Sequence, residues 1–283
     1  VSTRDIKGTV EAVSKFNESV MINGVMTVAN DVALTVACVA EKLKLPSIPV
    51  KLAEICSNKF KMKKYLTEKN IITPIYEKIY SKDKLEKLLN KWGYPIIIKP
   101  VDGRGARGVV FIRDKEDLKY YDHSVASSKK KYLLAEKFID GIQLSTESII
   151  YNQKVYTVAI SHRNYDQIDN LKPFIIENGG VIPAKLSTNE EISVLKMIEE
   201  IVKAIGLKNG TIKCDIVIGE NGPNLIEFAL RLSGGYLATD QIPRSSGVNL
   251  IKQVIKLSLG EALDEKELKP KKIRIGNLLI SLE

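Results

Sequence analysis

Two carboxylates stand twelve positions apart in a pattern that predicts a β-hairpin. Asp215 lies within one apolar run and Glu227 ends the next, and the turn-forming sequence Gly-Glu-Asn-Gly-Pro separates the two runs. If the runs pair as antiparallel strands, both carboxylates can face one cavity, where their oxygens suit Mg²⁺ bound together with nucleotide phosphates. The alternative is a structural hairpin whose acids pair with Lys213 or Arg231.

A second stretch combines a buried strand with a basic, glycine-rich turn. The apolar run 95–99 ends in Lys99, and the turn that follows contains Gly103, Arg104, Gly105 and Gly108. Glycines let backbone N–H groups approach phosphate oxygens, while the lysine and arginines supply charge. A strand-like run follows the turn, which argues against a Walker A loop or a dinucleotide fingerprint. The pattern favours phosphate binding, and an ordinary glycine hairpin is the alternative.

Composition excludes several other classes of protein. The chain has 283 residues, of which 44% are hydrophobic and 27% charged, and it lacks an apolar run of membrane-spanning length. Cys38, Cys56 and Cys214 show no CxxC spacing and there are two histidines, so we expect reduced cysteines and no zinc site. The net charge of +9 comes from scattered lysines, which argues against nucleic acid. We expect a cytoplasmic protein.

The first quarter of the chain alternates helix and strand patterns. We expect helices at 7–16, 31–44 and 57–69 and a buried strand at 20–28, with Asp31 capping the second helix. Such alternation predicts a parallel sheet. The chain starts at Val1, inside this pattern, and we therefore expect a fragment of a longer protein.

The remaining three quarters predict two further units. A small α+β unit starts at Ile75 and ends near residue 137, and we expect it to move as a lid. It begins with a strand from Ile75, its further strands are 95–99, 108–113 and 132–137, and its helices are 81–91 and 115–126. The last unit predicts strands at 143–150 and 154–161, a polar loop to 185, helices at 189–205 and 248–259 on either side of the hairpin, and a final strand at 273–282.

Together these motifs resemble the ATP-grasp superfamily, most closely its carboxylate–amine ligase branch, which includes amino-acid ligases, carbamoyl phosphate synthetase and biotin carboxylase. The resemblance implies a fold of mixed α/β and α+β class. It would consist of a partial N-terminal parallel-sheet (pre-ATP-grasp) domain at 1–74, a lid subdomain at 75–137, and a C-terminal antiparallel-sheet subdomain at 138–283 that carries the metal and substrate sites.

The resemblance also implies an ATP site. Lys59 and Lys99 match the two lysines that bind phosphates, and the turn from Gly103 to Gly108, with Arg104 and Gly105, matches the lid loop. Residues 134–139 match the hinge that reads adenine and ribose, at Glu136, Lys137 and Ile139. In the next strand Gln143 replaces the usual acid, which leaves Glu147 as the carboxylate that approaches the nucleotide.

The hairpin matches the metal site of the family. The resemblance implies that Asp215 and Glu227 hold Mg²⁺, with Mn²⁺ as a substitute, and that Arg231 neutralises the transferring phosphate. The family signature continues E-x-N-x-R, whereas this chain reads Glu-Phe-Ala-Leu-Arg, so that Ala229 removes one expected ligand.

Substrate contacts are expected in two loops. The candidates implied by the resemblance are His162, Arg163, Glu177, Lys185, Gly234, Gly235 and Arg244. Two of them have ordinary alternatives, because a lone histidine is more often structural and Arg244 can pair with Asp240 on the surface.

The function implied by the resemblance is an ATP-dependent ligase that activates a carboxylate as an acyl phosphate and transfers it to an amine. Its partners would be small molecules, and ligases of this kind are often homodimers. A carboxylase of the biotin or carbamoyl phosphate type, using bicarbonate, is one alternative, weakened by the missing A-M-K-M biotin sequence. A nucleotide-binding pseudoenzyme is another, because Gln143 and Ala229 depart from the family pattern. Nucleic-acid binding is the alternative from composition alone.

Overall fold

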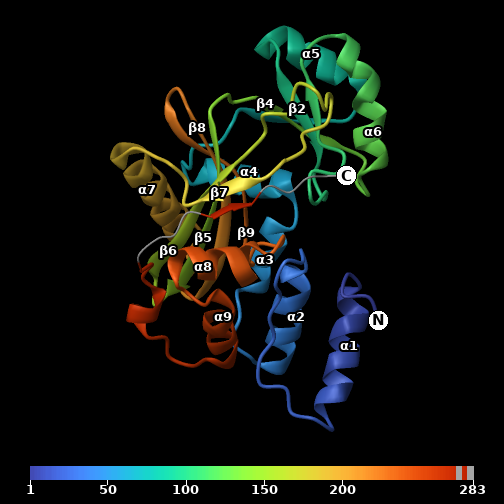
Figure 1. The fold of residues 1–283 in the computed structure, drawn as a ribbon. Coiled ribbons are helices and arrows are strands. Elements are labelled where there is room, and N and C mark those ends of the chain that lie inside the picture. The colour runs from blue at the N-terminus through green and yellow to red at the C-terminus, as the bar shows by residue number, and fades with distance from the viewer. Residues whose placement is uncertain (272–275, 279–283) are drawn as a thin grey trace.

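The computed structural model of the protein describes residues 1–271 and 276–278. Two antiparallel sheets form its centre, a smaller one of four strands and a larger one of six, and helices surround them. In Figure 1 the smaller sheet lies above the larger one, and the first helices of the chain extend below and to the side. No helix in the described ranges is long and apolar enough to cross a membrane.

Four helices open the chain: α1 (Ile6–Asn17), α2 (Ala33–Leu43), α3 (Val50–Cys56) and α4 (Lys59–Glu68). Three of them confirm the expected helices, and α3 is an addition. α4 begins where it does because the side chain of Asn58 accepts a hydrogen bond from the N–H of Lys61 at 3.0 Å. α2 begins differently, since its cap residue is Val32, which offers no side-chain hydrogen bond. The expectation that Asp31 caps this helix is wrong.

Residues 20–28 do not form the expected buried strand. Val20 and Met21 are exposed, and the segment's strand-type pairing is a single isolated parallel bridge between Val28 and Leu232. Nowhere in residues 1–74, all of them described, does a second strand lie beside this segment to satisfy its backbone groups. The expected N-terminal parallel sheet is therefore wrong for this part of the structure.

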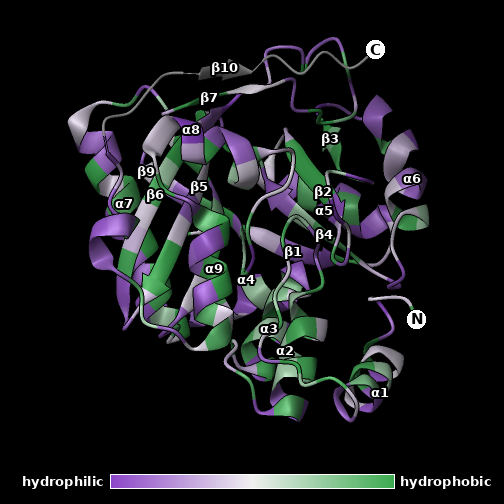
Figure 2. Cartoon of the chain, turned by 60° about the horizontal axis from the view of Figure 1, so that its bottom comes forward, coloured by the Kyte–Doolittle hydropathy of each residue, from purple (hydrophilic) through white to green (hydrophobic). Residues whose placement is uncertain are grey.

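The smaller sheet has the strand order β1-β4-β2-β3. One face packs on α5 (Lys82–Trp92), the 3₁₀ helix Glu116–Tyr120 and α6 (Tyr121–Ala126), and forms a core of its own. The expected elements of the lid are confirmed, although its division from the rest at 74 and 137 stays a prediction. Figure 2 shows how hydrophobic β2 is. The strands are β1 (Tyr76–Ile79), β2 (Ile96–Pro100), β3 (Val110–Ile112) and β4 (Leu133–Lys137).

The larger sheet has the strand order β10-β7-β6-β5-β8-β9 and contains the predicted hairpin as β8 and β9. The short strand β7 and the helix α8 (Ile242–Ser246) were not expected. Part of the expected last strand is present as β10, and the rest of 273–282 lies outside the described residues. The strands are β5 (Ile142–Tyr151), β6 (Lys154–Arg163), β7 (Gly180–Ile182), β8 (Gly210–Gly219), β9 (Gly222–Ala229) and β10 (Gly276–Leu278).

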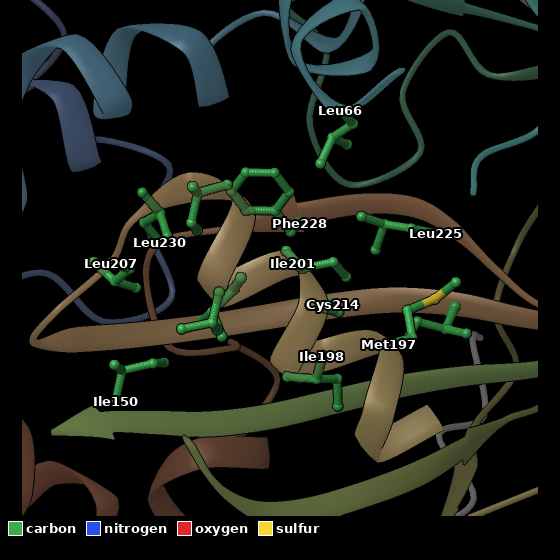
Figure 3. Close-up of a cluster of buried hydrophobic side chains, with 14 of the residues drawn as sticks. Leu66, Ile150, Met197, Ile198, Ile201, Leu207, Cys214, Leu225, Phe228 and Leu230 are labelled. Atoms are coloured by element: carbon green, nitrogen blue, oxygen red, sulfur yellow. The ribbon is translucent and has the colours of Figure 1, made fainter. Parts of the chain in front are cut away.

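The two faces of the larger sheet differ in chemistry. One face packs on α7 (Thr188–Ile205) in the main hydrophobic core, where Cys214 and Phe228 contact helix residues such as Ile198 (Figure 3). Toward one end of the sheet, α8 and α9 (Leu250–Leu259) cover the other face. Because side chains alternate along a strand, Asp215 and Glu227 point away from α7. Asp215 and Glu227 therefore lie on the part of the second face that α8 and α9 leave uncovered.

Candidate active site

Asp215 and Glu227 are directly opposite each other across β8 and β9. Nζ of Lys213 lies 2.5 Å from Oδ2 of Asp215, and Nη1 of Arg163 lies 3.1 Å from Oδ1. Glu227 pairs with Lys59 rather than with Arg231. The predicted hairpin and the predicted convergence of its two acids are confirmed, and in the structure both acids are neutralised by cationic side chains.

Lys59 reaches Glu227 from the first turn of α4. Its backbone N–H donates to the carbonyl oxygen of Val101 at 2.9 Å, which ties the start of the helix to the end of β2. The cap at Asn58 fixes the same turn. Two elements far apart in the sequence thus hold the Lys59 ammonium at the hairpin.

A buried cluster of three charges lies beside this pair. Oε2 of Glu136 is 2.5 Å from Nζ of Lys99, and Oε1 is 3.1 Å from Nζ of Lys63, which also donates to the carbonyl oxygen of Leu225 at 3.0 Å. Lys99 and Glu136 lie on the face of the smaller sheet that α5 and α6 leave free, because their neighbours Ile98 and Ala135 belong to the lid core. The cluster joins the lid, α4 and β9.

Burial and charge oppose each other in these acids. Burial pushes the pKa of Glu227 upward, but Lys59, Lys99 and Lys213 outweigh it and hold the pKa well below its usual range. The same balance, with Lys213 and Arg163 as partners, lowers the pKa of Asp215. Both carboxylates are therefore ionised at neutral pH.

Lys63 shows the cost of burial. Its side chain is fully buried, and burial lowers its pKa to about 8, although Glu136 acts in the opposite direction. The pKa of Glu136 is lowered because the two lysines outweigh the effect of burial. The Glu136 side chain is thus engaged by lysines, and its expected role in reading the nucleotide stays a prediction.

The rest of the hinge is held by backbone contacts. Nζ of Lys137 donates to the carbonyl oxygen of Trp92, at the end of α5, at 2.6 Å. The backbone N–H of Lys137 donates to the carbonyl oxygen of Ile75 at 2.9 Å. Ile139 lies against Gly219, where an added Cβ would come within 2.7 Å of the Ile139 side chain. The Lys137 side chain is thus used structurally, and its expected contact with the nucleotide stays a prediction.

A cavity of about 520 Å³ opens beside the hairpin. Its wall includes residues from the N-terminal helices, the glycine-rich turn and β9, and the structure therefore brings together six of the expected site residues. These are Lys59, Gly103, Arg104, Gly105, Glu227 and Arg231. Ala229, the departure from the family signature, also lines it.

Arg231 is positioned by a residue that the sequence did not single out as part of the site. Its Nε donates to Oδ1 of Asp31 at 2.6 Å, and Oδ2 of the same carboxylate lies 4.0 Å from Nε of Arg104. Asp31 therefore joins the turn of the lid to the end of β9. No short-range pattern marks it, since its partners are remote in the sequence.

Glu147 lies on the same face of the larger sheet as Asp215. Oε1 accepts from the N–H of Ser233 at 2.9 Å, whereas Oε2 is buried without a hydrogen-bond partner in the described structure. Burial raises the pKa of Glu147 to about 7, although Ser233, Lys213 and Arg231 act in the opposite direction. A buried acid of this kind is a common feature of functional sites.

The expected substrate residues divide into two groups. Arg163 belongs to the site, because its Nη1 lies 3.1 Å from Oδ1 of Asp215. Its Nη2 lies 2.5 Å from Oε2 of Glu177, which is thereby held next to the site. His162 lies on the opposite face of β6, as side chains alternate there.

The other expected substrate residues do not line the cavity. Lys185 is exposed, and Arg244 is an exposed side chain 4.0 Å from Asp240, which matches the surface-pair alternative. Gly234 packs under Ala29, and Gly235 is exposed. The structure does not bring these residues to Asp215 and Glu227, and their contact with a substrate stays a prediction.

Asp215 and Glu227 suit a metal ion whose remaining ligands come from a bound molecule and water. Among the described residues no group of three or more His, Cys, Asp or Glu side chains is placed to hold a metal ion. Two carboxylates are available, and Oδ1 of Asp215 is buried without a well-aligned hydrogen bond. Mg²⁺ commonly binds through one or two carboxylates plus phosphate oxygens and water. Asp215 and Glu227 suit that arrangement.

Two antiparallel sheets thus bring lysines and carboxylates together between them. A family model described as ATP-grasp domain matches residues 56–235, and the chain therefore belongs to the ATP-grasp family.

Solved structures and curated relatives agree with this assignment. An L-amino acid ligase from Bacillus licheniformis superposes with a TM-score of 0.81 and 25% identity over 96% of this chain and 65% of its own. The biotin carboxylase domain of a 2-oxoglutarate carboxylase from Hydrogenobacter thermophilus, solved in complex with MgADP, shares the fold. It superposes with a TM-score of 0.75 and 18% identity over 94% of this chain and 60% of its own.

Among curated proteins, the carbamoyl phosphate synthase large chain of Helicobacter pylori is 26% identical over 68% of this chain and 18% of its own length. An uncharacterized protein y4rH of Sinorhizobium fredii is 24% identical over 83% of this chain and 48% of its own. The chain thus spans about half the length of the y4rH protein and a smaller part of the carbamoyl phosphate synthase large chain.

Proposed function

We propose that this chain forms the nucleotide-binding and catalytic part of an ATP-dependent ligase that joins a carboxylate to an amine. The observation that carries the proposal is the pairing of Glu227, opposite Asp215 in the larger sheet, with Lys59 of α4, close to the charge of Lys99, which pairs with Glu136 in the lid. Paired acids among cations suit Mg²⁺ with nucleotide phosphates better than they suit a purely structural hairpin.

The reaction would proceed in two transfers. A carboxylate oxygen of the substrate attacks the γ-phosphorus of ATP, the bond to the β-phosphate oxygen breaks, and ADP leaves. The amine then attacks the carbonyl carbon of the acyl phosphate, inorganic phosphate departs, and the nitrogen loses a proton. Metal bound at the carboxylates would offset phosphate charge during the first transfer.

The chain's own residues divide this work. Lys59 and Lys99 would hold phosphate oxygens. Gly103, Arg104, Gly105 and Arg107 of the glycine-rich turn line the cavity, where the backbone of the turn can cover the phosphates. Arg231, two residues beyond β9, lines the cavity, where it would stabilise charge on the group in transit. Closure of the lid would exclude water, which otherwise hydrolyses an acyl phosphate.

Release of ADP tests the proposal. Wild type is incubated with Mg-ATP and a panel of amino-acid pairs and other carboxylate–amine pairs, beside Glu227→Gln and Glu220→Gln. Glu220 is an exposed acid in the turn of the same hairpin and provides the matched control. We expect ADP to depend on a substrate pair and to fall at least about 100-fold in Glu227→Gln alone. An active Glu227→Gln contradicts the metal assignment, and nucleotide binding without ADP across the panel favours the pseudoenzyme.

A bicarbonate-using carboxylase is the second candidate, because curated relatives that match most of this chain are named carbamoyl phosphate synthase. Bicarbonate is itself a carboxylate, so the same residues would activate it. Adding bicarbonate without any other carboxylate separates the two reactions, since ADP formation under that condition supports the carboxylase. Homodimer formation is a further proposal, which sedimentation tests directly.

A further inference from the structure

Lys63 is a fully buried lysine that the proposed reaction does not use. It follows Lys59 by one turn of α4, and none of its side chain is exposed. Its Nζ donates to the carbonyl oxygen of Leu225 in β9 at 3.0 Å and lies 3.1 Å from Oε1 of Glu136 in the lid. Lysine is almost never buried so completely unless it is paired. The carboxylate of Glu136 is therefore the counter-charge that keeps Lys63 in the interior.

Glu136 divides its two oxygens between two lysines. Oε2 lies 2.5 Å from Nζ of Lys99, whereas Oε1 is approached by Lys63 without a well-aligned hydrogen bond in the described structure. All three side chains are buried, with at most 6% of each exposed. Two positive charges thus share one negative charge in the interior, and Oε1 can still accept a closer bond from Lys63.

Lys99 is engaged by Glu136 rather than by the cavity. Lys59 lines the cavity beside the hairpin, whereas Lys99 does not belong to its wall in the described structure. To hold a phosphate oxygen, the Lys99 ammonium must leave Glu136 or be shared between the carboxylate and the phosphate. If Glu136 had no other partner, the departure of Lys99 would leave an ionised carboxylate unpaired in the interior, which is costly. Lys63 lowers that cost because it stays beside Oε1.

We propose that Lys63 is a positioning residue for the nucleotide, which keeps Glu136 neutralised while the Lys99 ammonium holds a phosphate oxygen. The inference rests on the proposed function and adds to it a residue that touches neither the nucleotide nor the metal. Glu136 exchanges Lys99 for Lys63 as its closer partner when nucleotide binds, and regains Lys99 when nucleotide leaves. The hydrogen bond to Leu225 holds the Lys63 ammonium in place for this exchange.

Calorimetric titration of Mg-ADP tests the exchange on the whole chain, because ADP carries phosphates and is not consumed. Lys63→Met removes the second partner of Glu136 and keeps an apolar side chain of similar length. The double variant Lys63→Met/Glu136→Gln also removes the carboxylate that competes for Lys99. Lys64→Met is the matched control, since Lys64 is the next residue of the same helix, with its side chain 66% exposed and 3.9 Å from Glu68.

We expect Lys63→Met to weaken Mg-ADP binding at least about tenfold, because Lys99 then stays with Glu136. The double variant should return to within about threefold of wild type, and Lys64→Met should stay within about twofold. A purely structural role of Lys63 predicts the opposite for the double variant, since the loss of a second buried group would add to the first loss.

The pH dependence of binding provides a second measurement, on wild type and on whichever variant without Lys63 is better folded. Burial lowers the pKa of Lys63 to about 8, with Lys99 acting in the same direction and Glu136 and Glu227 acting against both. In the folded chain Lys63 is therefore charged below pH 8 and loses its charge as the pH rises through 8. Mg-ADP affinity should fall at least about threefold between pH 7 and pH 9 in wild type, and by a smaller factor in the variant.

Three results would overturn the inference while the proposed function stands, provided that wild type binds Mg-ADP. They are equal affinity of Lys63→Met and wild type, a double variant that binds no better than Lys63→Met, and a pH dependence that is the same with and without Lys63. If wild type itself fails to bind Mg-ADP, the inference and the proposed function fail together.

Discussion

Arg231 and Asp31 form an ion pair that joins the chain just after β9 to the chain just before α2, with Nε and Oδ1 2.6 Å apart in residues that lie 200 positions apart in the sequence. Both side chains are mostly buried, at 16% and 33% exposed. The pair holds the guanidinium in the cavity wall beside Glu227. Asp31 is therefore a positioning residue for the arginine that the proposed reaction uses.

Asp31→Asn should lower ADP formation about tenfold while Mg-ATP affinity stays within about twofold, because Arg231 loses its anchor but the lysines keep theirs. Asp240→Asn is the control, since Asp240 faces an exposed arginine at 4.0 Å. Steady-state kinetics and nucleotide titration measure the two quantities. Equal activity of Asp31→Asn and wild type would show that Arg231 needs no such anchor.

Glu136→Gln should destabilise the fold by about 3–5 kcal/mol, because it leaves the buried ammonium groups of Lys63 and Lys99 without their shared counter-charge. Lys63→Met should cost less, since Lys99 still neutralises Glu136. Urea unfolding measures both. The matched control is Glu77→Gln in the same sheet, where Lys84 lies 3.7 Å away near the surface, and it should cost less than about 1 kcal/mol. A Glu136→Gln cost as small as that of the control would contradict a charged cluster.

Glu147 should make stability depend on pH. Burial raises its pKa from 4.5 to about 7 in the folded chain, against the opposing influence of Ser233, Lys213 and Arg231. Between these two values the folded chain keeps a proton that the unfolded chain has lost, so the contribution of Glu147 to stability is present at low pH and falls as the pH rises through 7.

Glu147→Gln removes this titration but keeps an acceptor for Ser233. Relative to wild type, the variant should therefore gain on the order of 1–3 kcal/mol in unfolding free energy between pH 5 and pH 8. Urea unfolding of both proteins across this range provides the measurement. A difference between the two that stays constant with pH would show that Glu147 is ionised throughout.

The sequence was sufficient where the signal is local. The hairpin of Asp215 and Glu227 was predictable because two apolar runs flank a turn-rich sequence, and pairing across the turn then sets the two acids opposite each other. The lid was predictable for similar reasons, since each of its elements has its own periodicity and breakers.

The remainder depends on tertiary contacts. Lys63 is one of four lysines in α4, and no local pattern distinguishes the buried one from its exposed neighbours. Residues 20–28 have the composition of a strand, but in the described structure they find one bridge and stay partly exposed. The position of Asp31 in the sequence predicts a helix cap, but in the structure Asp31 pairs with Arg231, which only the tertiary fold brings close to it.

Calorimetric titration of Mg-ATP tests the central claim most directly, with wild type, Lys99→Ala and Glu227→Gln compared in one buffer with and without Mg²⁺. We predict Mg²⁺-dependent binding by wild type that each variant weakens at least about tenfold, because each removes a charge from the proposed phosphate and metal site. Absence of binding by wild type, or equal affinity in all three proteins, would contradict the assignment of this site to ATP.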